Sequence, residues 1–321
     1  MSTRTIKKLI FNCFLTLAFL SIAGNEKCFS KGVPVISPGV TSVQLKILSW
    51  NIGMLPFLNL LSEKNDHAEA IAKALSSEDY DIIVFEEAFT MQARTIIRNI
   101  LKERYPYVYG PVNKSLLSLK FNGGVWILSK IPLIIKKEIE FTSFAGFDSF
   151  ARKGAILFEG QIHNTLFQLI TTHLQDDEYP QYIRVNQLNE IYDKLIVPYS
   201  DPGIPQIICG DFNTDEKVAE NYSGMLNTLN AEDGALSGTN KITFDDQSND
   251  AFHSRHPDPR QIDYILTRNS QLIQRMQRQV SVFKSRWGKG KEYLSDHNAI
   301  EATIEFRKPD YLSKTDKNNT K

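Results

Sequence analysis

Short apolar runs recur along this chain, and six of them adjoin polar clusters that can bind a metal ion or a phosphate. Such runs, bounded by turn residues, are typical of buried β-strands. One polar cluster at a strand end is weak support for a site, but six of them predict that the strand ends converge on one catalytic centre. The clusters are Trp50-Asn51, Glu86-Glu87, Thr172-His173, Gly210-Asp211-Phe212-Asn213, Gln261-Ile262-Asp263-Tyr264 and Ser295-Asp296-His297.

The distribution of the apolar runs predicts an α+β fold. Residues 43–50 alternate between apolar and polar side chains, as in a half-buried strand, and residues 81–85 form a continuous apolar run. Helical spacing is confined to a few segments and is clearest over residues 182–196. Because the strands do not alternate strictly with helices, a doubly wound parallel sheet is not expected.

The N-terminal segment predicts that the protein is exported. Arg4, Lys7 and Lys8 precede an apolar segment over residues 9–23, and small residues follow it. This order is that of a secretory signal peptide, whereas a membrane-spanning helix usually needs about 20 apolar residues. We therefore expect a secreted protein, with an uncleaved membrane anchor as the less favoured alternative. The expected organisation is a signal peptide over 1–30, a linker over 31–42, one domain over 43–307 and a disordered polar tail over 308–321.

The composition is that of an ordinary soluble protein with no general attraction for nucleic acid. Hydrophobic residues make up 42% of the chain and charged residues 23%. The 37 basic residues are balanced by 37 acidic ones, whereas proteins that bind nucleic acid usually present a basic face. We therefore expect a monomer that does not act on nucleic acid.

Several carboxylates and amides stand where they could hold a hard cation. Glu87 follows the run 81–85, and a carboxylate with a fixed backbone there can bind Mg²⁺. Asn51 ends another run, and Asp211 and Asn213 would point to one side if strand geometry persists through them. Each residue also has a simpler interpretation, as a surface glutamate, a turn residue or part of an Asx-turn.

Two histidines suggest acid–base chemistry. Asp263, on a separate strand, could accept the Nδ1 proton of His297 and fix its tautomer, which would leave Nε2 free to take a proton from water. His173 closes another apolar run, although a lone histidine at a strand end is more often structural. Together with the carboxylates, and with no apparent serine or cysteine nucleophile, these residues favour metal-assisted hydrolysis by water.

The order of the motifs over residues 43–306 resembles that of the endonuclease/exonuclease/phosphatase superfamily. The series is Ser49-Trp50-Asn51, Glu86-Glu87, Asn122-Gly123-Gly124-Val125, Thr172-His173-Leu174-Gln175, Gly210-Asp211-Phe212-Asn213, Ile262-Asp263-Tyr264-Ile265 and Ser295-Asp296-His297. Within that superfamily the chain is most similar to the neutral sphingomyelinases of the secreted bacterial type. The stretches that carry this narrower resemblance are Asn51-Ile52-Gly53-Met54-Leu55-Pro56, Thr172-His173-Leu174-Gln175-Asp176 and Asp148-Ser149-Phe150-Ala151-Arg152-Lys153-Gly154.

The resemblance implies a DNase-like fold, which is a four-layer α/β/β/α sandwich with two packed, mainly antiparallel sheets. It also implies a phosphodiesterase that depends on Mg²⁺, with Mn²⁺ or Co²⁺ as substitutes. Carried over to this sequence, Glu87 is the main metal ligand, with Asn51 beside it. Asp296 is then a further metal ligand or electrostatic group.

The resemblance also implies roles for the other motif residues. Asp211 and Asn213 would position the attacking water and the phosphate. His297, oriented by Asp263, resembles the general base, although Asp211 is an alternative acceptor for the proton of the water. His173 resembles the group that stabilises or protonates the leaving side.

One ion pair, two aromatic residues and one glutamate are also expected to influence the site or its contact with membrane. Asp148 and Lys153 would form an ion pair that orders a loop over the site. Trp287 and Phe283 lie between cations in a segment that matches a membrane-inserting hairpin of secreted relatives, so we expect them to contact membrane. Glu86 replaces the family's usual Asn or Gln, and either adds charge at the metal or faces away from it.

The expected reaction is hydrolysis of sphingomyelin to ceramide and phosphocholine at a phospholipid membrane surface, with a choline phospholipid as substrate. Two alternatives keep the chemistry and change the substrate: a secreted metal-dependent nuclease and a phosphoinositide phosphatase. A third is a non-catalytic module that retains the fold and binds lipid or another partner.

Overall fold

The computed structural model describes residues 43–55, 61–115, 118–245, 249–250 and 258–307. The expected signal peptide over 1–30, the linker over 31–42 and the tail over 308–321 lie outside these residues. No helix of the described part is long and apolar enough to cross a membrane.

Two large β-sheets form the centre of the domain. The seven-stranded sheet has the order β10-β12-β15-β1-β2-β4-β3, and the six-stranded sheet has the order β5-β6-β7-β8-β11-β9. In the first sheet the strands are β10 (Ala235–Leu236), β12 (Ile273–Ser281), β15 (Ala299–Phe306), β1 (Val43–Asn51), β2 (Ile82–Glu86), β4 (Trp126–Ser129) and β3 (Tyr107–Tyr109). In the second they are β5 (Leu133–Glu140), β6 (Gly154–Ile162), β7 (Thr165–His173), β8 (Gln206–Asp211), β11 (Asp263–Arg268) and β9 (Glu232–Asp233).

Most neighbouring strands run antiparallel. The parallel pairs are β1 with β2, β7 with β8, and β10 with β12. The expectation of mainly antiparallel sheets is therefore confirmed.

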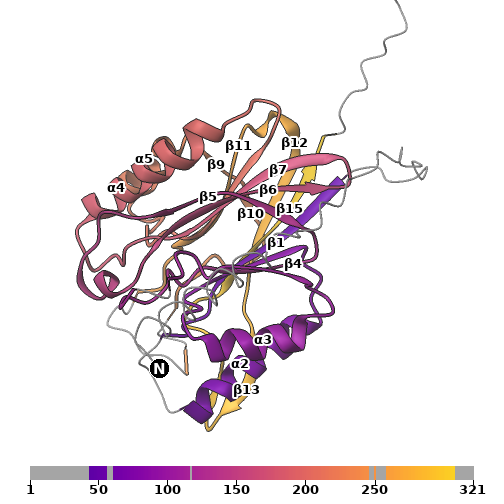
Figure 1. The fold of residues 1–321 in the computed structure, drawn as a ribbon, viewed down its shortest axis with the longest axis vertical. Helices are drawn as coiled ribbons and strands as arrows, with labels where there is room; N and C mark the ends of the chain where they lie inside the picture. Colours follow the sequence, from indigo (N-terminus) through magenta and orange to yellow (C-terminus); the bar gives the residue numbers. More distant parts are fainter. Residues whose placement is uncertain (1–42, 56–60, 116–117, 246–248, 251–257, 308–321) are drawn as a thin grey trace, which may run out of the picture. The chain divides into compact units, whose positions relative to one another are not determined.

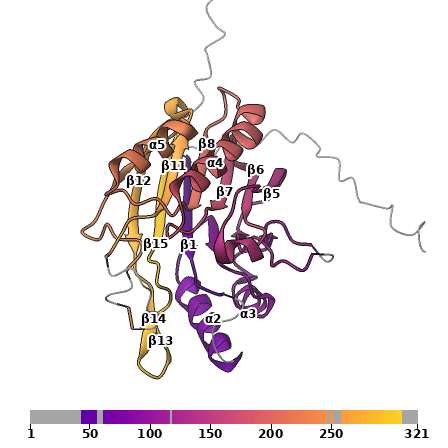
Figure 2. The same ribbon diagram turned by 90° about the vertical axis from the view of Figure 1, so that its left-hand side faces the viewer.

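Helices cover the outer face of each sheet. Apolar side chains of α2 (Leu61–Ser76) and α3 (Met91–Leu101) pack on the seven-stranded sheet. Those of α4 (Gln181–Ile191) and α5 (Ala219–Leu229) pack on the six-stranded sheet. Figures 1 and 2 show the two helix pairs at opposite ends of the stack, with the sheets between them. The predicted four-layer sandwich is thus confirmed.

The side-chain alternation of the strands separates an inner face from an outer face. On β1, Leu45 and Ile47 lie in the core between the sheets, whereas Leu48 and Trp50 pack toward α2 and α3. Because successive side chains of a strand point to opposite faces, Asn51 at the end of β1 belongs to the inner set. The strand therefore delivers a polar side chain to the end of the core between the sheets.

Two segments differ from the expected secondary structure. The helix predicted over 182–196 ends as α4 at Ile191 and continues as one π-helical turn, Tyr192–Ile196, followed by the short helix Val197–Tyr199. The strand β12 begins at Ile273, whereas the apolar pattern alone predicts a strand only over residues 280–283, because most side chains of β12 are polar. The strand forms because eight of its residues pair with β15.

The hairpin formed by β13 (Lys284–Gly288) and β14 (Lys291–Tyr293) does not present its tryptophan to solvent. Trp287 is only 7% exposed and stacks on His67, with ring centroids 4.1 Å apart. Its Nε1 donates a hydrogen bond to the Tyr293 carbonyl at 2.7 Å, and Phe283 packs against Trp50. Both rings pack into the core beneath α2, so this arrangement does not support the expected membrane contact through Trp287 and Phe283, which stays a prediction.

The burial of His67 predicts a pH-dependent stability. Burial lowers the pKa of His67 from 6.5 to about 4, although its hydrogen bond to the Leu294 carbonyl opposes the shift. Below pH 6.5 the unfolded chain therefore takes up a proton that the folded chain does not, so the free energy of unfolding falls as the pH drops toward 4. The full effect is about 3 kcal/mol.

Denaturant unfolding of the His67→Gln variant across this range is the measurement. We expect its free energy of unfolding to fall less steeply with decreasing pH than that of the wild type. The exposed His163 provides the control, because His163→Asn should retain the wild-type slope. Equal slopes in all three proteins would contradict the prediction.

Candidate active site

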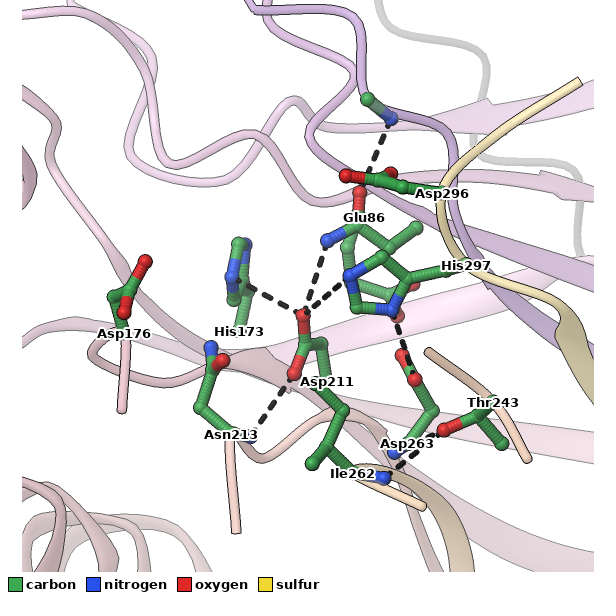
Figure 3. Close-up of polar contacts among 12 residues, drawn as sticks. Glu86, His173, Asp176, Asp211, Asn213, Thr243, Ile262, Asp263, Asp296 and His297 are labelled. Carbon is green, nitrogen blue, oxygen red and sulfur yellow. Dashed lines mark hydrogen bonds and ion pairs between the residues drawn. The ribbon is translucent and has the colours of Figure 1, made fainter. Parts of the chain in front are cut away.

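The polar clusters found in the sequence meet at one end of the core between the sheets (Figure 3). They come from strands of both sheets, at the carboxyl ends of β1, β2, β7 and β8 and at the amino ends of β11 and β15. In each case the inner-facing apolar residues of the strand give way to a polar residue at this end. The residues are Asn51, Glu86, His173, Asp211 and Asp263, with His297 two residues before the start of β15.

His297 and Asp263 form the pair that the sequence suggested. The two atoms that meet are His297 Nδ1 and Asp263 Oδ2, at 2.9 Å, and both side chains are buried. Burial alone would lower the pKa of His297, but the charge and hydrogen bond of Asp263, with the charges of Asp211 and Asp296, raise it well above its usual value. The pair fixes the ring so that Nε2 faces Asp211.

Asp211 lies at the centre of the site. Its Oδ2 accepts a hydrogen bond from Asn51 Nδ2 at 3.0 Å and lies 3.5 Å from His173 Nε2 and 3.8 Å from His297 Nε2. Burial, followed by the negative charge of Asp263, raises the pKa of Asp211 to about 7. A carboxyl group that titrates near neutral pH can accept a proton during a reaction.

Asn51 and Asn213, the two amide residues of the site, each lie in a turn. Asn51 Oδ1 accepts from the Gly53 amide at 3.1 Å, and Asp211 Oδ1 accepts from the Asn213 amide at 2.9 Å, so both are Asx-turns. The strand geometry does not persist to Asn213, whose φ is +48°. This left-handed turn directs the Asn213 side chain toward the Leu174 carbonyl, which it contacts at 3.2 Å.

His173 is bound by a buried lysine. Lys153 Nζ lies 3.1 Å from His173 Nε2 and also donates to Asp148 Oδ2 and to the Leu174 carbonyl, each at 2.9 Å. Because an ammonium group only donates, His173 Nε2 is the acceptor, and burial and the Lys153 charge lower the pKa of His173 well below its usual value. Asp148 also accepts from the Asp176 amide at 3.2 Å, which ties two loops together.

Glu87 and Asp296 form an acidic group beside this centre. Glu87 follows β2 with a φ of +52°, a backbone conformation that is uncommon for a residue with a side chain. Burial, followed by the charge of Asp296, raises the pKa of Glu87 to about 7. Two neighbouring carboxylates fit a divalent cation, which prefers oxygen ligands and would relieve the repulsion between their charges.

Glu86 faces away from Glu87, into the core between the sheets. Its Oε1 accepts a hydrogen bond from Ser49 Oγ at 2.8 Å, and its Oε2 has no partner among the described residues. Burial, followed by the charges of Asp263 and Asp211, raises the pKa of Glu86 well above its usual value. Burial therefore favours the protonated form of this carboxyl group, which lies behind the site.

A second compact group of possible metal-binding atoms is Asp211, Asp263 and His297, whose ligand atoms lie within 4.8 Å of one another. The hydrogen bond between His297 and Asp263 already uses two of these atoms. The carboxylates of Glu87 and Asp296, which repel each other, are the better candidates for a cation.

Several hydrogen bonds that support the site carried no signal in the sequence, although Trp50 and Ser295 belong to its motifs. Thr243 Oγ1 accepts from the backbone amides of Ile262 and Asp263 at 2.9 and 3.1 Å, which fixes the start of β11. Trp50 Nε1 donates to the His297 carbonyl at 2.9 Å. Ser295 Oγ donates to the Asn51 carbonyl at 2.6 Å. These bonds join distant parts of the chain, so no local pattern could have revealed them.

Comparisons with known proteins point to one family. The sequence model of the endonuclease/exonuclease/phosphatase family matches residues 48–297. Sphingomyelinase C 2 of Leptospira interrogans is 33% identical over 254 residues, which cover 71% of this chain and 40% of that relative. Phospholipase C of Staphylococcus aureus is 28% identical over 246 residues, covering 70% of this chain and 73% of that relative. The chain thus spans less than half the length of the first relative.

A solved structure agrees with the sequence comparisons. A mutant beta toxin of Staphylococcus aureus, crystallised with bound magnesium ions, superposes with a TM-score of 0.72 at 25% identity. The match covers 82% of this chain and 99% of the toxin.

Proposed function

This chain belongs to the endonuclease/exonuclease/phosphatase family, and we propose that it hydrolyses sphingomyelin to ceramide and phosphocholine in a Mg²⁺-dependent reaction. The observation that carries the proposal is the buried His297–Asp263 pair facing Asp211, at a point where strands of both sheets end. The substrate is suggested by relatives named sphingomyelinase C and phospholipase C. The basic and apolar start of the sequence supports secretion, and lipid as substrate implies work at a membrane surface.

In the proposed reaction a water oxygen attacks phosphorus, and the bond from phosphorus to the ceramide oxygen breaks. One proton leaves the water and one reaches the ceramide oxygen. Asp211 Oδ2 and His297 Nε2 face each other at 3.8 Å, so whichever of the two is unprotonated can take the proton from water held between them. Asn213 lies beside Asp211 and would help to position the phosphate.

Glu87, Asp296 and Asn51 would hold Mg²⁺, which when bound would withdraw negative charge from the phosphate oxygens. The Lys153 ammonium is in direct contact with His173, so the two residues form a cationic group on the other side of Asp211. This group would stabilise charge on the leaving side, because a buried cation acts strongly where water is excluded.

The experiment that tests this function is phosphocholine release from vesicles of sphingomyelin or phosphatidylcholine, measured with Mg²⁺ and with a chelator. We expect release from sphingomyelin that stops when the chelator is added. No release from either lipid, together with nicking of plasmid DNA, would instead support the nuclease alternative.

The ion pair of Lys153 with Asp148 leads to a prediction for turnover. Lys153→Met keeps most of the length of the side chain and removes the charge, so we expect turnover to fall by about 10²-fold while the Mg²⁺ concentration for half-maximal activity stays the same. Steady-state rates over a Mg²⁺ titration provide the measurement, with Lys137→Met, at an exposed position of β5, as the control. Unchanged turnover would exclude a role for Lys153 in the reaction.

A further inference from the structure

A group of exposed apolar side chains lies next to the proposed active site. Phe147 is 85% exposed, Phe150 60% and Phe144 41%, and the side chain of Leu119 is fully exposed. These are the only phenylalanines exposed to this degree in the part of the chain that the structure describes, and all belong to one short segment. We call Phe144, Phe147, Phe150 and Leu119 the aromatic rim.

Local structure brings the members of the aromatic rim together. Phe147 and Phe150 belong to the 3₁₀ helix η1 (Gly146–Phe150), in which side chains three residues apart lie on one side. The chain around Leu119 runs beside this segment, because the Phe121 amide donates to the Phe150 carbonyl at 2.8 Å. Lys120 Nζ lies 4.4 Å from the centre of the Phe144 ring.

The same segment is bound to the active site by its polar residues. Asp148, between the two most exposed phenylalanines, is the partner of Lys153, which contacts His173. The Ala145 amide donates to Gln175 Oε1 at 2.7 Å, and Gln175 lies two residues after His173. The inward side of η1 therefore faces the site, while its phenylalanines point to solvent.

We propose that the aromatic rim inserts into a phospholipid bilayer and so brings the mouth of the active site onto the membrane. This proposal rests on the proposed function, in which the substrate is a bilayer lipid. Exposed phenylalanines with a neighbouring lysine suit the boundary between headgroups and acyl chains, where the rings are buried and the ammonium stays among the headgroups. Because Trp287 is buried, its ring is not available for insertion into the bilayer in this conformation.

The charges near the rim indicate which lipid surface it suits. Asp148 is neutralised by Lys153, whereas Asp176 and Glu178 are exposed on the adjacent loop. These carboxylates disfavour a strongly anionic surface, so the partner is a zwitterionic, choline-type bilayer. Binding that depends on apolar insertion should also change little between low and high salt.

Vesicle binding by the Phe147→Ser/Phe150→Ser double variant tests the proposal. Binding to phosphatidylcholine vesicles with and without sphingomyelin is measured by co-sedimentation, in chelator so that no lipid is hydrolysed. We expect roughly 10-fold or greater weakening, since two phenylalanine rings would no longer leave water. The control is Ile134→Ser, an exposed apolar residue at the opposite end of the six-stranded sheet, which should bind like the wild type.

A fluorescence reporter gives a second measurement that does not depend on weakened binding. The chain has three tryptophans, Trp50, Trp126 and Trp287, and all are buried. A Phe147→Trp variant therefore adds one exposed fluorophore, whose emission should shift to the blue on addition of vesicles. Brominated lipid should quench this signal if the ring enters the bilayer.

The outcomes separate this proposal from the proposed function. Wild-type binding that survives in the double variant, absence of vesicle binding by the wild type, or an unshifted emission of the Phe147→Trp variant would each overturn the role of the rim. Vesicle binding that is lost in the double variant, in a protein that releases no phosphocholine with Mg²⁺, would support the rim and contradict the function. A water-soluble phosphocholine ester, if hydrolysed equally by both proteins, would show that the double variant retains an intact site.

Discussion

Replacing His297 by asparagine should lower the rate of phosphocholine release by about 10³-fold, the range expected for loss of an acid–base group. The side chain of asparagine is close in size to the imidazole but cannot take a proton from water at neutral pH. The measurement is the steady-state rate of phosphocholine release from sphingomyelin vesicles at saturating Mg²⁺. A loss of less than about tenfold would exclude His297 as the residue that carries the proton.

Two further variants make the result specific. His163→Asn makes the same chemical change at an exposed turn and should retain full activity. Asp263→Asn leaves the imidazole in place but removes the charge at its Nδ1, 2.9 Å away, so it should be slower than wild type but faster than His297→Asn. The pH–rate profiles of His297→Asn and Asp211→Asn then identify the proton acceptor. A variant that still contains the acceptor should still show the ionisation of that group in its profile, whereas the variant that lacks the acceptor should not.

Replacing Glu87 by glutamine should raise the Mg²⁺ concentration needed for half-maximal activity by roughly 10²-fold, since a hard cation would lose a charged ligand. The carboxyl group lies beside Asp296 and has its pKa raised to about 7, so its charge is costly unless a cation is bound. Activity over a Mg²⁺ titration provides the first measurement. Stabilisation of the fold by Mg²⁺ in thermal unfolding provides the second, because a ligand of the folded state raises its stability.

The neighbouring residue supplies the matched control. Glu86 is buried and accepts from Ser49, and burial favours its protonated form, so Glu86→Gln keeps the shape of the side chain and an acceptor for Ser49. We expect Glu86→Gln to keep the Mg²⁺ dependence of the wild type within about threefold. If Glu86→Gln and Glu87→Gln raised the Mg²⁺ concentration for half-maximal activity equally, the role of Glu87 as the main metal ligand would be contradicted.

The sequence predicted the fold class and the convergence of the polar clusters because both follow from local pattern. Apolar alternation identifies strands, and the residue at which it stops, as at Asn51 or Asp211, marks the end of the strand that carries the site. The pairing of His297 with Asp263 was also accessible, because each closes or opens an apolar run.

What the sequence missed depends on tertiary contacts. Trp287 between lysines has the composition of a membrane-contacting residue, and only the stacking on His67, far away in the chain, turns it inward. Conversely, Phe147 was not singled out and Phe150 appeared only within the stretch that contains Asp148 and Lys153, since exposure is not visible in a sequence. The strand β12 was largely missed because its side chains are mostly polar, and its partner β15 stabilises it.

The division of the site between two sheets has a consequence for how activity develops as the chain folds. Asn51, Glu87 and His297 come from the seven-stranded sheet, whereas Asp211 and Asp263 come from the six-stranded sheet. An intermediate with only one sheet formed would hold only part of the proposed catalytic groups and should be inert. The proposed hydrolysis could therefore begin only after the two sheets have docked, so the appearance of activity during refolding would report when docking occurs.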